Sequence, residues 1–241
     1  MNAQALSLKQ IKTTQRMKFT YWGHATFSVV VGGTKLLFDP FVTPNPLAKD
    51  IDIKTIGADY ILISHGHGDH IADAAAIAEH TGATVICAPE VAAWLKKQGV
   101  TRIHEMNFGS YTFDFGTVTM VPAAHSSGLP DGSYGGNPGG FVVRSAEKNF
   151  YYSGDTSLTM EMQLIPFYAK PDFAVLPIGG NYTMNAEEAL RCAEMIHCDK
   201  IIGVHYDSFP VISIDREDAK SRFTLANKEL LLPGIGESLD I

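Results

Sequence analysis

Short apolar runs recur along the chain, and most of them end in a polar residue or a glycine turn. Such runs, rich in β-branched and aromatic residues, are typical of β-strands. We expect about eleven strands on this basis, over residues 18–22, 27–31, 35–38, 60–63, 84–87, 111–113, 117–121, 141–144, 149–152, 173–176 and 200–204. The turns at 114–116 and 146–148 predict β-hairpins between their neighbouring strands.

Four other segments follow a helical pattern, each with a recognisable start or stop. An alanine-rich segment ends before Gly82, a second begins near Pro89, and a third has Asn185 as N-cap with Glu188 three residues later. Glycine favours helix C-termini, proline favours the first turn, and the Asn/Glu spacing is that of a capping box. The fourth begins after Asp215, which is also a capping residue. The predicted helices cover residues 71–80, 89–98, 185–196 and 215–227.

The order of these elements predicts the fold class. Hairpins come first and single strand–helix alternation follows, which indicates an α/β fold built in layers around mixed β-sheets. No linker, repeat or low-complexity tract interrupts residues 17–241, so we expect one domain there, preceded by an N-terminal extension over residues 1–16.

One strand leads into a cluster of residues that can bind metal. The run 60–63 is followed by His65-Gly66-His67-Gly68-Asp69-His70. Imidazole and carboxylate are the ligands that zinc and similar divalent metals prefer, and glycine leaves room for the ion. His65 and His67 would point the same way on an extended segment, whereas Asp69 and His70 point apart and can serve a second centre. The sequence therefore predicts one loop that supplies ligands to two metal ions.

Three later strands end in further candidate ligands. His125 follows the run 117–121, Asp155 follows 149–152, and His205 directly follows 200–204. The carboxyl ends of strands can converge on one edge of a layered sheet protein and form a crevice there. We therefore expect these three residues to share one site with the loop at 65–70.

With these residues identified, the chain resembles the metallo-β-lactamase-fold hydrolases. The His-x-His-x-Asp-His stretch at 65–70, the following His125, a Ser-Gly-Asp segment that ends in Asp155 and the last His205 match that superfamily in order and spacing. Four further segments, at residues 22–27, 38–41, 176–180 and 205–210, narrow the resemblance. They are similar to those of a small single-domain branch of metal-dependent hydrolases that resembles the ascorbate-6-phosphate lactonases. The resemblance implies a four-layer αβ/βα sandwich, in which helices flank two mixed β-sheets with the metals at one edge.

All seven positions of that family's dinuclear metal site carry a matching residue. The resemblance assigns His65, His67 and His125 to the first metal. It assigns Asp69, His70 and His205 to the second metal, and Asp155 bridges the two. Asp69 and Asp155 would also take part in catalysis. Ligands that are all nitrogen and oxygen make zinc the first candidate and also admit manganese, iron or nickel.

A dinuclear centre of this kind predicts a hydrolase. Two divalent ions outweigh the charges of two aspartates and a bridging hydroxide, so the centre favours an anionic substrate or transition state. A metal-bound water loses its proton near neutral pH and becomes the nucleophile. We expect cleavage of a small, anionic ester, lactone, thioester or phosphodiester. The alternatives are an iron-dependent oxidoreductase on the same fold and a metal-binding protein without turnover.

Four more residues and one loop are candidates for the surroundings of the metals. His24 and Asp39 lie at or just after strand ends, where they would support ligands or face substrate; the alternative for both is a structural hydrogen bond. Asn181 and Asp207 are weaker candidates for substrate contacts. The glycine-rich loop 126–140 predicts a substrate lid or a merely permissive connection.

Composition limits the partners. A net charge of −7 argues against a nucleic-acid partner bound by phosphate neutralisation. No apolar run is long enough to span a bilayer, and residues 1–16 lack the apolar centre of a secretory signal. The three cysteines form no Cys-x-x-Cys pair, which is typical of a reducing compartment. We expect a cytoplasmic protein that acts on a small molecule without a membrane, and whether it forms a homo-oligomer stays open.

Overall fold

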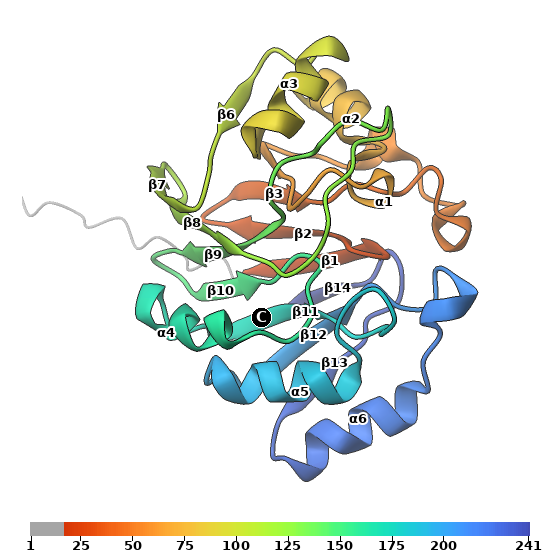
Figure 1. The fold of residues 1–241 in the computed structure, drawn as a ribbon, viewed down its shortest axis with the longest axis vertical. Coiled ribbons are helices and arrows are strands. Elements are labelled where there is room, and N and C mark those ends of the chain that lie inside the picture. The colour runs from red at the N-terminus through yellow and green to blue at the C-terminus, as the bar shows by residue number, and fades with distance from the viewer. Residues whose placement is uncertain (1–16) are drawn as a thin grey trace, which may run out of the picture.

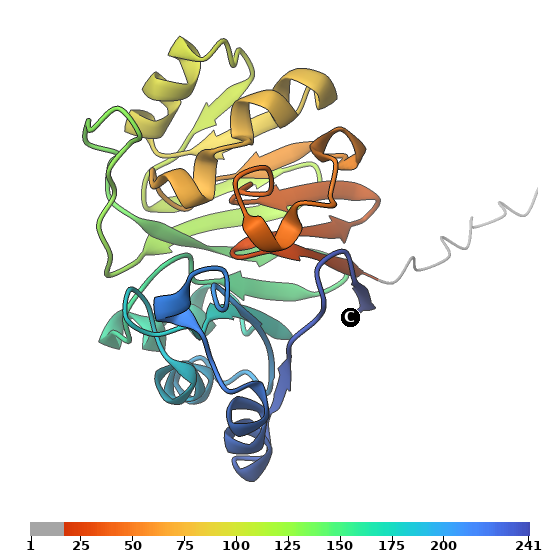
Figure 2. The ribbon, with the colours of Figure 1, turned by 90° about the vertical axis from the view of Figure 1, so that its right-hand side faces the viewer.

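Two seven-stranded β-sheets pack against each other in the computed structural model, which describes residues 17–241. The predicted extension over residues 1–16 lies outside the described residues. Two helices cover the outer face of each sheet (Figure 1), namely α2 (Ala74–Thr81) and α3 (Pro89–Lys97) on the first and α5 (Ala186–Met195) and α6 (Arg216–Leu225) on the second. The turned view separates the layers into helix, sheet, sheet and helix (Figure 2). The predicted four-layer αβ/βα sandwich is therefore confirmed.

The first sheet is antiparallel on one side and parallel on the other. Its strands lie in the order β14 (Ser238–Asp240), β1 (Lys18–Gly23), β2 (Thr26–Val31), β3 (Thr34–Phe38), β4 (Tyr60–Leu62), β5 (Thr84–Cys87) and β6 (Ile103–Glu105). Pairing is antiparallel from β14 to β3 and parallel from β3 to β6. The turn between β1 and β2 therefore lies at the same edge as the carboxyl ends of β3 and β4.

The second sheet has the same mixed design. Its strands lie in the order β13 (Glu229–Leu231), β12 (Lys200–Val204), β11 (Phe173–Pro177), β10 (Asn149–Tyr152), β9 (Gly139–Arg144), β8 (Gly116–Pro122) and β7 (Gly109–Phe113). Pairing is antiparallel from β7 to β10 and parallel from β10 to β13. Because β8 and β10 both run opposite to β9, the carboxyl ends of β8, β10 and β12 share one edge of the sheet.

Three strands were not predicted from the sequence, and all three are the outermost strands of their sheets. These are β6, β13 and β14, each three residues long. Three residues are too few to show the alternation of apolar and polar side chains that identifies a strand in a sequence. The conformation of so short a segment is decided by hydrogen bonds to a neighbouring strand, which local sequence does not record.

The helix predictions hold except at one point. Helices α3, α5 and α6 form where expected, and Asn185 and Glu188 form the predicted capping box. The prediction of one helix over 71–80 is wrong at its start, because the chain forms α1 (Gly68–Ile71) and then α2 from Ala74 onward. Asp73 lies at the break, where its carboxylate accepts the N–H groups of Val42 and Thr43 at 2.6 and 2.9 Å. A short helix α4 (Ile165–Tyr168) was not predicted.

Aromatic side chains fill the space between the two sheets. The ring of Phe38 stacks on Phe27 with centroids 4.5 Å apart and meets the edges of Phe141 and Tyr152 from the other sheet. Aromatic pairs of this kind add to the free energy that burial of their surface already supplies. A second apolar cluster lies between the second sheet and helices α5 and α6. The two sheets are therefore held together directly beneath the edge that carries the candidate ligands.

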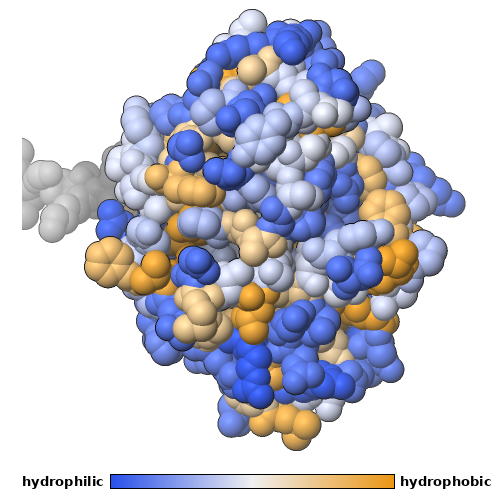
Figure 3. All heavy atoms as spheres, in the orientation of Figure 1, coloured by the Kyte–Doolittle hydropathy of each residue, from blue (hydrophilic) through white to orange (hydrophobic). Residues whose placement is uncertain are grey.

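Apolar side chains on the face in Figure 3 form small patches separated by polar ones. Exposed large apolar residues occur before and within α4, where Met160, Leu164 and Phe167 are 68%, 56% and 86% exposed. None of the helices in residues 17–241 is long and apolar enough to cross a membrane.

The break between α1 and α2 leads to a test of stability. Asp73→Ala would leave one buried and one part-buried backbone N–H group without an acceptor, so we expect the free energy of unfolding to fall by about 2 kcal/mol. Urea unfolding with detection by circular dichroism measures this loss. Asp59→Ala is the matched control, because Asp59 accepts only the more exposed N–H of Lys35. Equal losses in the two variants would contradict the anchoring role of Asp73.

Candidate metal centre

Seven predicted ligands come together at one edge of the sandwich. The loop after β4 carries His65 and leads into α1, where His67 is the N-cap and Asp69 and His70 lie in the first turn. The three later ligands follow the carboxyl ends of β8, β10 and β12, and these are His125, Asp155 and His205. The structure thus brings all seven side chains to one edge, as the strand directions require.

Three histidines form the first group of candidate ligands. His65, His67 and His125 each offer a nitrogen, and these nitrogens lie within 4.8 Å of one another. The Nε2 of His65 is 3.0 Å from the Nδ1 of His67. Two ligands of one zinc ion, each bonded at 2.0–2.1 Å, lie roughly 3.3 Å apart in a tetrahedron. The spacing therefore fits two nitrogens that share an ion.

Asp155 lies between this group and the second one. Its Oδ2 is 3.2 Å from Nε2 of His70 and 2.9 Å from Nε2 of His205, and it is 3.6 Å from Nε2 of His125. One carboxylate oxygen therefore faces imidazoles of both predicted groups. This is the position that a bridging ligand requires.

The electrostatics of the site favour the metal-binding forms of Asp155, His65 and His24. Burial alone would raise the pKa of Asp155, but the neighbouring His205 and His70 hold it well below its usual value. Burial, reinforced by His70, lowers the pKa of His65 well below normal. Burial and the nearby His205 lower the pKa of His24 to about 4. A carboxylate and neutral imidazoles are the protonation states that ligate a cation.

Unpartnered nitrogens show that the residues fit a metal. Nε2 of His70 and both ring nitrogens of His205 are buried and make no hydrogen bond within the described part of the chain. A buried polar atom without a partner costs free energy, so native proteins rarely leave one. An ion held among His70, His205 and Asp155 would satisfy both Nε2 atoms.

Asp39 anchors the ligand loop from beneath. It is fully buried, and its Oδ1 accepts the Ser64 N–H at 2.7 Å. Its Oδ2 accepts the Ser64 hydroxyl at 2.5 Å, the Tyr152 hydroxyl at 2.6 Å and Nδ1–H of His70 at 2.8 Å. Four donors occupy the carboxylate, so Asp39 orients His70 and is not itself free for a metal. An acceptor behind a ligating histidine fixes the ring and strengthens it as a ligand.

Sequence reasoning found Asp39 but missed its partners. Ser64 precedes His65 directly, and position alone was the signal that could have found it. Tyr152 comes from β10 of the second sheet, and no local pattern distinguishes it from the other aromatic residues of the core. Its hydroxyl reaches across the interface between the sheets to Asp39.

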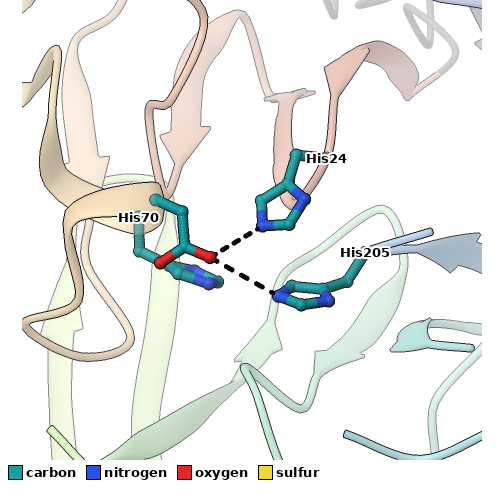
Figure 4. Close-up of side chains that lie close together, drawn as sticks. His24, His70 and His205 are labelled. Atoms are coloured by element: carbon teal, nitrogen blue, oxygen red, sulfur yellow. Dashed lines mark hydrogen bonds and ion pairs between the residues drawn. The ribbon is translucent and has the colours of Figure 1, made fainter. Parts of the chain in front are cut away.

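The remaining candidates separate into one that lies in the site and two that do not. His24 joins Asp69, His70 and His205 in a second group whose ligand atoms lie within 4.8 Å of one another. Nε2 of His24 and Nε2 of His205 lie 3.1 and 3.9 Å from Oδ2 of Asp69. Figure 4 shows the rings of His24 and His205 turned toward one carboxylate oxygen between them. Among residues 17–241, Asn181 and Asp207 belong to none of the candidate groups. Both carboxylate oxygens of Asp207 accept hydrogen bonds, one from the Ile214 N–H and the other from the Arg216 guanidinium.

The glycine-rich loop 126–140 folds against the ligand loop. The Ser127 hydroxyl accepts the Gly66 N–H at 3.0 Å, and a Cβ added at Gly135 would lie 2.5 Å from that same Oγ. Glycine is therefore required where the two loops touch. An open hollow of about 560 Å³ lies beside His67 and His125 and is lined by this loop, including Ser126, Tyr134 and Asn137.

The role of Asp39 can be tested by measuring metal affinity. The amide of Asp39→Asn has one acceptor oxygen for four donors, and its NH2 group must face one of them, so the His70 ring loses its fixed orientation and we expect affinity for metal to fall by about 10- to 100-fold. Dialysis against a competing chelator followed by elemental analysis measures it. Tyr152→Phe is the control, because it removes one donor and leaves the His70 contact. An Asn variant that holds metal as tightly as the wild type would refute the role.

Comparison with known proteins gives the family of this chain. Residues 34–206 match the family model described as the beta-lactamase superfamily domain. The chain is 48% identical over 226 residues to a UPF0173 metal-dependent hydrolase of Flavobacterium johnsoniae and 50% identical over 227 residues to one of Christiangramia forsetii, in each case over 93% of this chain and 100% of the relative.

A solved structure agrees with the sequence relatives. Igni18, a metallo hydrolase from the archaeon Ignicoccus hospitalis, superimposes with a TM-score of 0.83 at 33% identity, over 92% of this chain and 97% of that protein. The chain therefore belongs to the beta-lactamase superfamily, as a metal-dependent hydrolase of the metallo-β-lactamase fold.

Proposed function

We propose that this protein is a dinuclear hydrolase that cleaves a small anionic ester, lactone, thioester or phosphodiester. The observation that carries the proposal is the position of Asp155 Oδ2, within 3.6 Å of imidazole nitrogens from both candidate groups. A carboxylate placed in this way can bind two ions and fix the distance between them. His65, His67 and His125 would hold the first ion, and Asp69, His70 and His205 would hold the second.

The charge of the site supports an anionic substrate. Two divalent ions bound here would supply a hydroxide nucleophile near neutral pH and a positive field for the developing oxyanion. Neutral imidazoles add no charge, so the only charged ligands in the proposed set are Asp69 and Asp155. The charge of two divalent ions would exceed the charge of these two carboxylates. The hollow beside His67 and His125 is lined by polar groups such as Ser126, Tyr134 and Asn137, which can orient polar atoms of a substrate.

Zinc is the first candidate for the metal. Nitrogen and oxygen ligands also suit manganese, iron and nickel, so the ligand set alone does not select the ion.

The assignment of ligands leads to a direct test. We expect His67→Ala and Asp155→Ala each to lose bound metal and to reduce turnover by at least about a hundredfold, because each removes a ligand rather than a group behind one. His80→Ala is the control, since His80 is exposed and its ring contacts only the backbone oxygens of Ala76 and Ile56. Full metal content and full turnover in either ligand variant would show that the assignment is wrong.

The reaction class is tested on the wild-type protein. Elemental analysis after reconstitution with zinc, manganese, iron or nickel should find two ions per chain. The same preparations are screened against lactones, thioesters, carboxylic esters and phosphodiesters. Fewer than two ions would remove the basis of the dinuclear mechanism. Two irons with oxygen uptake and no hydrolysis would favour an oxidoreductase instead.

The hollow predicts where substrate binds. Tyr134 is 63% exposed and lines it, so Tyr134→Ala should raise KM about three- to tenfold, the amount expected for one aromatic contact, with kcat and metal content unchanged. Tyr182→Ala is the matched control, because Tyr182 is 55% exposed and is not among the residues lining the hollow. Steady-state kinetics on a substrate found in the screen measure both. An unchanged KM in the Tyr134 variant would place substrate elsewhere.

A further inference from the structure

His24 is buried and faces the second group of candidate ligands. It lies in the turn between β1 and β2, only 1% exposed, and its Nε2 is 3.1 Å from Oδ2 of Asp69. Its ring centroid is 4.0 Å from that of His205. We propose that His24 is a direct ligand of the second metal, alongside Asp69, His70 and His205. This inference rests on the dinuclear site proposed above.

The hydrogen bonding of His24 matches that of two predicted ligands, His65 and His70. Nδ1 of His65 is hydrogen-bonded to the Ser64 hydroxyl, and Nδ1 of His24 is hydrogen-bonded to the Ser208 hydroxyl. Nδ1 of His70 is likewise hydrogen-bonded to Asp39. In all three residues a protein oxygen holds Nδ1 and leaves Nε2 directed at the centre. This is how proteins orient a metal-binding imidazole.

The distance to Asp69 fits two ligands of one ion. Bonds of about 2.1 Å at a right angle place two ligand atoms about 3.0 Å apart, and the observed separation is 3.1 Å. If the Nδ1–H of His24 donates to Ser208, as in the His65–Ser64 pair, Nε2 carries no proton. A lone pair would then face a carboxylate oxygen, an arrangement that a cation between them makes favourable.

The backbone fixes His24 next to His205. The His24 carbonyl accepts the His205 N–H at 2.8 Å and the Tyr21 hydroxyl at 3.0 Å. Both histidines have left-handed backbones, with φ of 53° and 56°. Strained conformations of this kind persist where the surrounding structure holds them, commonly at functional sites. The two rings are thus positioned as a pair rather than independently.

An additional ligand changes the expected geometry of the second centre. His24, Asp69, His70, His205 and the bridging Asp155 would supply five protein atoms. Five protein ligands exceed the four that structural zinc almost always takes. Manganese, iron and nickel accept higher coordination numbers, so the additional ligand would make them stronger candidates for the second centre than for the first.

The competing interpretation is that His24 only positions Asp69. In that case Nε2–H donates to the Asp69 carboxylate, and Nδ1 accepts the Ser208 hydroxyl. A glutamine amide reaches about as far as Nε2 of histidine, so His24→Gln keeps a donor for Asp69 while it removes the imidazole. His24→Gln therefore separates the two roles better than alanine.

The experiment compares wild type, His24→Gln and Ser208→Ala after loading with cobalt. The readouts are ions per chain, the dissociation constant of the weaker ion against a competing chelator, and the visible cobalt spectrum, which reports coordination number. We expect His24→Gln to keep one ion, to weaken the other by at least about a hundredfold and to change its spectrum, and Ser208→Ala to weaken it by about tenfold. His80→Ala should match the wild type.

Two results would overturn the inference, and they can be distinguished. Two ions in the wild type together with an unchanged spectrum and affinity in His24→Gln would leave the dinuclear site intact and remove His24 from it. A wild type that holds a single ion would overturn the dinuclear proposal and the role of His24 together. Thermal unfolding of each variant without metal confirms that the comparison is between folded proteins.

Discussion

The contact between Asp39 and His70 is the interaction on which the rest of the site depends. Asp39 lies at the end of a strand in the first sheet, and its carboxylate accepts a hydroxyl from Tyr152 in the second. The same oxygen accepts Nδ1–H of His70, which aims Nε2 at Asp155. One buried carboxylate thus joins the two sheets, the ligand loop and a candidate ligand. Any shift of one sheet against the other would misplace the His70 ring.

Mixed sheets make such a centre possible at one edge. Parallel pairing in one half of each sheet and antiparallel pairing in the other bring strand ends and one hairpin turn to the same side. The chain must turn sharply where these strands end, and Asp39, His24 and His205 do so with φ of 41°, 53° and 56°. Each such residue costs about 1–3 kcal/mol. At Asp39 and His24 this strain is offset by side-chain hydrogen bonds, which glycine could not make.

The sequence was sufficient to predict the layers and the position of the seven candidate ligands, because both follow from strand direction. Apolar runs mark the strands, and a ligand that follows a run lies at its carboxyl end. The break at Asp73 and the three outermost strands were not predictable, since distant partners decide them. The Ser208 hydroxyl that holds His24 was not predictable either, because 184 residues separate the pair. Supporting contacts of this kind form only once the sheets have packed.

The charge at the centre is linked to metal binding. Asp39 and Asp155 are both buried, and the His70 ring lies between them. Burial alone would lower the pKa of His70, but Asp155 and Asp39 outweigh it and raise that pKa well above its usual value. The two buried carboxylates therefore favour positive charge at His70. A metal ion on Nε2 would take the position of a proton there and bring more positive charge, so the same carboxylates would favour the binding of metal.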